Sequence, residues 1–231
     1  MRGTAYLIGS MQGSVAADVM EQALAALRAA GKSRPHVVIG YAALAADVDA
    51  LAFMTARVPR LFPDAETTRL VVDGEPDARR HDVAAGRSLV EEADLLVLSG
   101  GDPVVGARLL RESGAAAWIR AARARGAPCA GISAGAILLG AFWASWPENA
   151  PPGAPFDGGA LVECTNAVAD LVVDCHDEDG GWGELRLVGQ MLAAHGESPR
   201  LLGIPAGGAV IVAHDGSLRV VGEEPFRASL S

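Results

Sequence analysis

The residues best suited to chemistry lie in the segment 131–135, which reads Gly-Ile-Ser-Ala-Gly. A G-x-S-x-G pattern is typical of a nucleophile elbow, in which a strand turns sharply into a helix and the serine hydroxyl projects from the bend. Glycine is needed on both sides because a side chain there would collide across so tight a turn. The apolar run 128–132 can form the strand, and residues 134–140 can form the helix. We therefore interpret Ser133 as a nucleophile; the alternative is a packing turn rich in glycine and alanine with an incidental serine.

A serine hydroxyl is a weak nucleophile and needs a general base within hydrogen-bond reach. His176 is the best placed of the five histidines, because it directly follows the apolar run 171–175. Ligands of open α/β sheets bind beyond the carboxyl ends of the strands, where this histidine would lie. The other histidines occupy a strand start, a charged helix start, a helix end and a hairpin turn: His36, His81, His195 and His214. Position alone leaves a structural or solvated histidine as the alternative.

The anion formed when a serine attacks a carbonyl needs N–H groups that already point at it. The amide of Ala134 follows the nucleophile and is placed for this by the elbow itself. A second donor could come from the Gly100-Gly101 turn, which follows the apolar run 95–98. The alternative for this glycine pair is an ordinary turn between a strand and a helix.

Apolar runs that alternate with helical patterns predict the elements that carry these residues. Such runs indicate a mostly parallel sheet with helices on both faces, and the right-handed crossover rule makes it doubly wound and flavodoxin-like. We expect one α/β domain over residues 1–231, a loop at 144–159 and a C-terminal β-hairpin. The predicted strands are 4–8, 36–39, 67–72, 95–98, 128–132, 167–173, 209–213 and 218–221. The predicted helices are 15–27, 47–57, 82–93, 103–125 with a break at Gly114, 134–140 and 183–194.

Composition excludes several classes of partner. Half of the residues are apolar, the mean hydropathy is +0.25 and the net charge is −9. Because no cluster of Lys or Arg counters that charge, nucleic acid and anionic membrane are not expected as partners. The glycines at 9–13 lack G-x-G-x-x-G, and no metal-ligand spacing is present, so we expect neither a nucleotide cofactor nor a metal. The N-terminus lacks a signal-peptide pattern, and the three cysteines suit buried, reduced thiols, so we expect a cytoplasmic location. The sequence leaves both a monomer and a homo-oligomer open.

Four motifs in order resemble the serine peptidases of the dipeptidase E and cyanophycinase group. They are Leu-Leu-Val-Leu-Ser-Gly-Gly-Asp at 95–102, Gly-Ile-Ser-Ala-Gly-Ala at 131–136, Val-Val-Asp-Cys-His at 172–176 and Gly-Ile-Pro-Ala-Gly-Gly-Ala at 203–209. That group shares the fold of class I glutamine amidotransferases but has serine where those enzymes have cysteine. The resemblance implies a peptidase with Ser133 as nucleophile, His176 as base, and Gly101 with Ala134 as oxyanion hole.

The acid that orients the histidine departs from one branch of this group. In the cyanophycinase branch an acid stands in the late Gly-Ile motif, where this chain has Pro205 and Ala206. In the aspartyl dipeptidase branch the acid comes from the loop after the elbow helix, and Glu148 occupies a similar place. The resemblance thus implies a Ser-His-Glu triad completed by Glu148; the alternative for this residue is a solvent-facing loop glutamate. Asp174 is a rival, because residues i and i+2 of a strand point to the same side and could bring it near the histidine.

The segment after the histidine also departs from the group. Relatives often carry a phenylalanine and then arginines, whereas residues 177–184 read Asp-Glu-Asp-Gly-Gly-Trp-Gly-Glu. Arg186 is the arginine left nearby to bind a substrate carboxylate, with Gly100 and Asp102 as further substrate-binding candidates. An acidic rim would instead attract an ammonium group or a cationic side chain, although a solvated charge run is the alternative.

We therefore hypothesise a peptidase for short peptides that is not strictly specific for Asp-Xaa dipeptides. A non-catalytic binding module on the same fold and an esterase or amidase are the two other classes that these residues allow.

Overall fold

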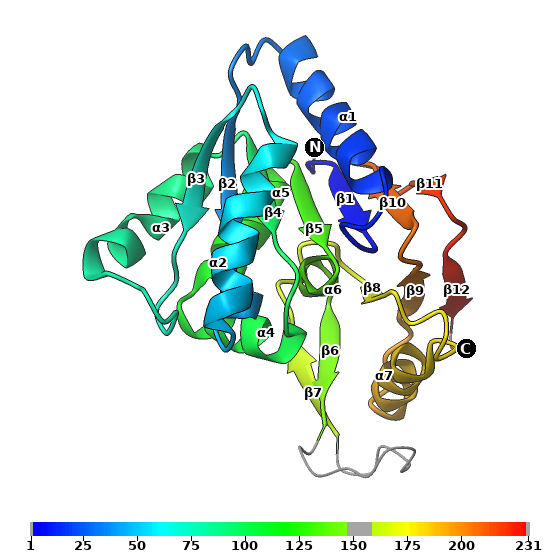
Figure 1. Cartoon of the computed structure of the whole chain (residues 1–231). Coiled ribbons are helices and arrows are strands. Elements are labelled where there is room, and N and C mark those ends of the chain that lie inside the picture. The colour runs from blue at the N-terminus through cyan, green and yellow to red at the C-terminus, as the bar shows by residue number, and fades with distance from the viewer. Residues whose placement is uncertain (1, 147–158, 230–231) are drawn as a thin grey trace.

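The computed structural model describes residues 2–146 and 159–229, and its centre is a seven-stranded sheet (Figure 1). The strand order is β11-β10-β1-β5-β4-β2-β3. The five strands β1, β5, β4, β2 and β3 are parallel to one another, whereas β10 pairs antiparallel with both β1 and β11. The strands are β1 (Ala5–Ile8), β2 (His36–Gly40), β3 (Glu66–Leu70), β4 (Leu95–Leu98), β5 (Cys129–Ile132), β10 (Gly208–Val212) and β11 (Leu218–Gly222). The mostly parallel sheet and the C-terminal hairpin of β10 and β11 are confirmed.

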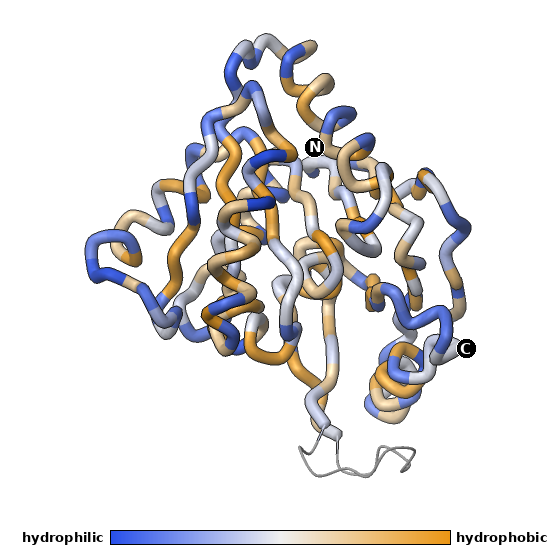
Figure 2. Tube along the Cα trace, viewed as in Figure 1, coloured by the Kyte–Doolittle hydropathy of each residue, from blue (hydrophilic) through white to orange (hydrophobic). Residues whose placement is uncertain are grey.

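Helices cover both faces of this sheet, as predicted. They are α1 (Val15–Ala29), α2 (Val48–Arg57), α3 (Arg80–Glu92), α4 (Pro103–Glu112), α5 (Ala115–Arg125) and α6 (Ala134–Leu139), with short 3₁₀ turns η1 (Ala42–Leu44) and η2 (Val58–Leu61). A further helix, α7 (Gly183–Ala194), packs instead on the strands Leu171–Cys175 and Arg200–Ile204, outside this sheet. Side chains of α1 and α2 pack in one apolar cluster, and those of α3 to α7 pack in a second. Strand residues alternate between the two clusters: Tyr6 and Ile8 face the first, whereas Leu7 faces the second. In Figure 2 many residues of the central strands are hydrophobic, whereas strongly hydrophilic residues gather in connecting segments at the periphery of the trace.

Two smaller sheets were not predicted. One has the order β12-β9-β8 and consists of β8 (Leu171–Cys175), β9 (Arg200–Ile204) and β12 (Phe226–Ser229). The other is a hairpin of β6 (Phe142–Ser145) and β7 (Ala160–Glu163), so strand structure borders the region expected to be a loop. The strand predicted at 167–173 is β8, which begins later and belongs to the three-stranded sheet rather than to the central one.

Two hydrogen-bonding contacts tie the ends of β8 to the rest of the molecule despite this separate pairing, and one of them reaches the central sheet. The amide of Ala141, just after α6, donates to the carbonyl of Leu171 at 2.8 Å. At the other end of β8, the Cys175 Sγ lies 3.9 Å from the Ile8 carbonyl oxygen. The carboxyl end of β8 therefore lies beside that of β1, and the three motif-bearing strand ends meet at one edge.

The cysteines are buried, as their pattern in the sequence suggested. Cys129, Cys164 and Cys175 are free and buried, and burial raises the pKa of each thiol, as befits unreactive packing residues. Within residues 2–146 and 159–229, no helix is long and apolar enough to cross a membrane.

Candidate active site

Ser133 occupies a sharp turn between β5 and α6. Its backbone has φ 53° and ψ −124°, a conformation that non-glycine residues rarely adopt. A Cβ atom on Gly131 would lie 2.3 Å from the Gly135 carbonyl oxygen, and one on Gly135 would lie 2.0 Å from the Leu98 carbonyl oxygen. Both glycines are therefore required by close backbone approach, and the turn has the strand, bend and helix of a nucleophile elbow.

His176 reaches the serine from the end of β8. Its Nε2 lies 2.8 Å from the Ser133 Oγ, within hydrogen-bond distance. The histidine also has a positive φ, 52°, and its amide donates to the Ile204 carbonyl at 2.9 Å, which fixes the backbone where β8 ends. The serine is half-buried and the histidine exposed, so substrate can approach the pair. This arrangement lets the hydroxyl pass its proton to Nε2 when the ring carries its own proton on Nδ1.

The Gly100-Gly101 turn lies directly beside the nucleophile. A Cβ atom on Gly100 would be 3.2 Å from the Ser133 Cβ and 3.6 Å from its Oγ. Gly101 has φ 136°, and a Cβ there would lie 2.3 Å from the Ala43 carbonyl oxygen, so the position requires glycine. Ala134 is the first residue of α6 and has no preceding helical turn to accept from its amide. The two predicted oxyanion donors thus flank the serine on two different elements.

A cleft of about 680 Å³ opens beside Ser133 and His176. Its lining includes the candidates Gly101, Asp102 and Ala134. Trp143, Trp146 and Ile137 provide apolar wall, while the other charged lining residues are Arg108, Asp174, Asp177 and Glu184. The cleft is therefore large enough for a small peptide and carries charges of both signs.

Comparison of the sequence and the fold with known proteins shows the family to which this chain belongs. The sequence matches the family model of peptidase family S51 over residues 7–220, nearly the whole chain. The chain belongs to peptidase family S51. It is therefore a serine-type peptidase, and the resemblance to the dipeptidase E group is confirmed. No curated protein matches the sequence.

Two solved structures share the fold of this S51 peptidase. A peptidase from an acI-B1 Actinobacterium is 20% identical and superposes with a TM-score of 0.74, covering 100% of this chain and 97% of that one. A putative peptidase E from Listeria monocytogenes is 12% identical with a TM-score of 0.63, covering 97% of this chain and 100% of that one. At 20% and 12% identity, these two structures show the fold alone.

Glu148 and Asp174 are the two candidates for the acid that orients the histidine of this S51 site. Glu148 lies outside the described residues. Asp174 is 4% exposed and its Oδ1 accepts from the Cys175 amide at 2.8 Å. Burial raises the pKa of Asp174 to about 7, the Cys175 amide lowers it, and the charges of Asp177 and Glu184 raise it. No hydrogen bond among the described residues joins Asp174 to His176, and its Oδ2 is buried without a hydrogen-bond partner there.

The predicted substrate-binding side chains lie in different places. Asp102 lines the cleft, but its Oδ1 caps α4 by accepting from the amides of Val104 at 2.7 Å and Val105 at 3.1 Å. The guanidinium of Arg186 lies 4.4 Å from the centre of the Phe226 ring, and this arginine is not part of the cleft lining. The structure thus brings Asp102 to the cleft and leaves Arg186 outside it.

Arg108 is a cleft residue that the sequence patterns did not indicate. It is exposed on α4, lines the cleft and forms no ion pair with another described residue. The available signal was its place in the second turn of a helix that starts at the glycine turn beside the nucleophile. A free guanidinium in this position can bind a substrate carboxylate.

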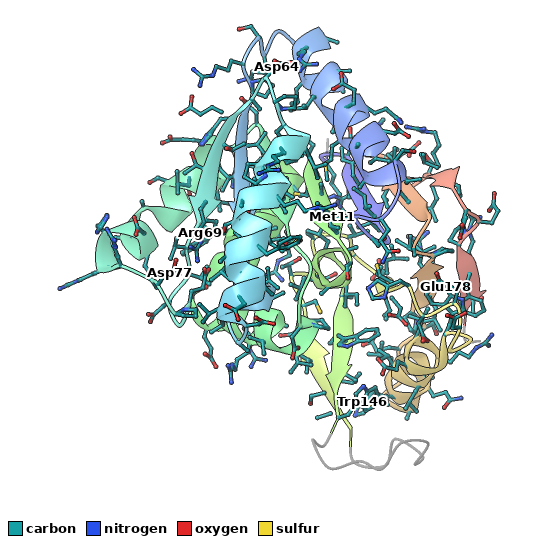
Figure 3. All side chains as sticks on the ribbon, viewed as in Figure 1. Met11, Asp64, Arg69, Asp77, Trp146 and Glu178 are labelled. Carbon is teal, nitrogen blue, oxygen red and sulfur yellow. The ribbon has the colours of Figure 1, made fainter. Side chains whose placement is uncertain are left out.

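A second cleft, of about 500 Å³, meets the first at Ser133. Both glycines of the 100–101 turn line it, together with apolar side chains from η1, α2 and the loop after β1: Met11, Leu44, Phe53 and Met54. Phe53 is 59% exposed, which is unusual for a large apolar side chain in this protein. Figure 3 shows Met11 and Trp146, which line one cleft each, on either side of α6 in that view. Ser10, Gln12 and Arg57 also line this second cleft, which we call the apolar cleft because, apart from Ser133, its other side chains are apolar. The serine therefore lies between a charged cleft and this apolar cleft.

Proposed function

We propose that this S51 peptidase hydrolyses short peptides through an acyl-enzyme formed on Ser133. The observation that carries the proposal is the distance of 2.8 Å between the Ser133 Oγ and the His176 Nε2, at an elbow that opens on a cleft. An unactivated hydroxyl would not attack a peptide bond at a useful rate, whereas a hydroxyl bonded to an imidazole can lose its proton as it attacks.

The reaction would proceed in two stages, acylation of Ser133 and then hydrolysis of the acyl-enzyme. Ser133 attacks the carbonyl carbon while His176 accepts the hydroxyl proton, and the amides of Gly101 and Ala134 stabilise the resulting oxyanion. The protonated imidazole then donates to the leaving amine, which breaks the C–N bond and leaves the acyl group on the serine. Water attacks this ester with His176 again as base, which releases the acid product and restores the free serine.

Glu148 is our choice for the acid that holds the imidazole through Nδ1. Asp174 is a weaker choice, because one of its oxygens binds the Cys175 amide and no described hydrogen bond links it to the histidine. Loss of the orienting acid in a serine triad lowers kcat by roughly 10⁴-fold. Glu148→Gln should therefore lower kcat far more than Asp174→Asn, and the reverse ranking would assign the role to Asp174.

The charge of the cleft argues against strict specificity for Asp-Xaa dipeptides. Three of the lining residues are the acids Asp174, Asp177 and Glu184, and these would repel an aspartyl side chain placed among them. A panel of dipeptides tests this point, and fastest turnover of Asp-Xaa would contradict it.

The catalytic proposal is tested by steady-state hydrolysis of peptides by wild type, Ser133→Ala and His176→Ala. Each substitution should lower kcat by roughly 10⁴–10⁶-fold without changing the thermal unfolding cooperativity. Comparison of a peptide with the ester of the same acyl group separates a peptidase from an esterase. Wild-type activity in either variant would refute the proposed roles.

A further inference from the structure

We propose that Asp174, Asp177 and Glu184 form a binding subsite for a cationic side chain, an ammonium or a guanidinium, on the amino acid that leaves as the amine. We call these three residues the acidic subsite. The inference rests on the proposed function and adds the substrate class: peptides cleaved on the amino side of a basic residue.

The three carboxyl groups come from separate elements and share one cleft. Asp174 is in the last part of β8, Asp177 follows His176, and Glu184 is in the first turn of α7. All three line the charged cleft, where Asp177 and Glu184 are half-buried. Burial is the main cause that raises the pKa of Asp174 and of Glu184; the charge of Asp177 raises both further, and that of Glu184 also raises the pKa of Asp174. Like charges gathered in this way favour a cation between them.

A separate observation, the surroundings of the Asp174 carboxyl group, supports a ligand that donates hydrogen bonds. Asp174 is 4% exposed, and its Oδ2 has no hydrogen-bond partner among the described residues. A buried carboxylate oxygen without a partner is unfavourable, and an N–H donor from a cation would satisfy it. None of the three acids takes part in an ion pair of the described chain, so no Lys or Arg there already neutralises them.

The position of His176 assigns the subsite to the leaving side of the scissile bond. The imidazole must reach both the serine oxygen and the departing nitrogen, so the leaving group has to lie on the side of the serine that faces the histidine. His176 lines the charged cleft and is not in the lining of the apolar cleft, although Ser133 and Gly101 line both. The leaving residue therefore enters the charged cleft, and the acyl part extends toward Phe53 and Met54.

The experiment separates binding from turnover by measuring binding to the full-length Ser133→Ala protein. Calorimetric titration compares Leu-Lys with Leu-norleucine, two dipeptides of similar length that differ by the ammonium group. We expect Leu-Lys to bind at least about tenfold more tightly, as for a charge-assisted contact. Adding Asp177→Asn or Glu184→Gln should reduce this ratio to about threefold or less. Asp179→Asn is the matched control: it removes one charge from the same segment, but Asp179 is exposed and not in the cleft lining, so the ratio should stay unchanged.

A second arm distinguishes the side-chain ammonium from the α-ammonium of the acyl residue. N-acetyl-Leu-Lys and N-acetyl-Leu-norleucine should keep the same ratio as the free dipeptides. A ratio near one for the free dipeptides, a ratio unaffected by both cleft substitutions, or a preference that disappears on acetylation would each overturn the proposal. A protein that prefers Leu-Lys but does not hydrolyse it would contradict the proposed function alone, so the two failures are distinguishable.

Discussion

Ser133 illustrates how function constrains a single residue. Its φ of 53° lies in a region where a side chain is strained, yet the elbow needs this conformation to direct the hydroxyl toward His176. Strain of this kind costs on the order of 1–3 kcal/mol and is characteristic of active sites. The surrounding elbow glycines and the hydrogen bond from the Ser133 amide to the Ile8 carbonyl, 2.8 Å, hold the residue in place.

This strain predicts that Ser133→Gly is more stable than Ser133→Ala. Both variants lose the hydroxyl and its contact with His176, but only glycine adopts the positive φ without steric cost. We expect the free energy of unfolding of the glycine variant to be about 1 kcal/mol higher, measured by urea denaturation. Equal stabilities would show that the elbow is unstrained.

Asp174 predicts how stability depends on pH. Burial raises its pKa from the ordinary 3.8 to about 7, so the folded protein holds a proton that the unfolded chain releases. The free energy of unfolding should therefore fall as the pH rises from about 4 to about 7. Asp174→Asn cannot ionise, so it should gain on wild type by up to about 4 kcal/mol near pH 8 and match it near pH 4. Urea denaturation at both pH values tests this, and parallel profiles for the two proteins would contradict it.

At this residue scale, the sequence predicted the centre of the site better than its periphery. Ser133 and His176 could be paired because each follows an apolar run, and strand ends converge on one edge. Arg186 was expected near the substrate because it is close in sequence, but its guanidinium packs on Phe226 instead. Arg108 was missed because its position depends on the direction in which α4 leaves the glycine turn, which no sequence period encodes.

At the scale of elements, the elbow joins α6 to its neighbouring strand through backbone contact. A Cβ on Gly135 would lie 2.0 Å from the Leu98 carbonyl oxygen, so Gly135→Ala forces α6 away from β4. We expect a loss of more than about 2 kcal/mol in the free energy of unfolding. Gly183→Ala in the first turn of α7 is the control, because its Cβ would meet nothing within 4 Å. Similar denaturation midpoints for the two variants would refute the packing argument.

An ion-pair network fixes the connection between β3 and α3. Arg69 bonds both the side chain of Glu75, which is fully buried, and Asp77, and Figure 3 shows the arginine and Asp77 facing each other. Arg69→Met would leave the Glu75 carboxylate buried without its cation, which costs about 3–5 kcal/mol. Arg87→Met, which removes the exposed pair of Arg87 and Glu91, should cost about 0.5 kcal/mol or less. Chemical denaturation at neutral pH tests the contrast, and equal losses would contradict it.

The central sheet was predictable at this scale because its buried strands read as continuous apolar runs between helical patterns. The two small sheets were not. Between α6 and Phe142 of β6 the chain has only Gly140 and Ala141, so β6 reads as a continuation of the apolar run around the elbow helix rather than as a separate strand. β12 is four residues long with alternating exposure, and it pairs with β9, more than twenty residues earlier in the chain. Such pairings depend on tertiary contacts rather than on local periodicity.

On the scale of the whole molecule, the active site lies where two separately paired sheets meet. Ser133 follows β5 of the central sheet and His176 follows β8 of the three-stranded one, so their contact of 2.8 Å depends on how the two sheets pack. The S51 family match extends over residues 7–220, which includes every strand that places a candidate residue. The charged and apolar clefts both reach Ser133.

Covalent labelling with a fluorophosphonate, followed by intact-mass measurement and peptide mapping, tests most directly whether Ser133 is activated. We expect one adduct per chain, located on Ser133, absent in Ser133→Ala and formed much more slowly in His176→Ala. Ser10→Ala is the control, because Ser10 lines the apolar cleft near the nucleophile and should leave labelling unchanged. An unlabelled wild-type protein, or equal labelling of Ser133→Ala, would contradict the central claim that Ser133 is an activated nucleophile.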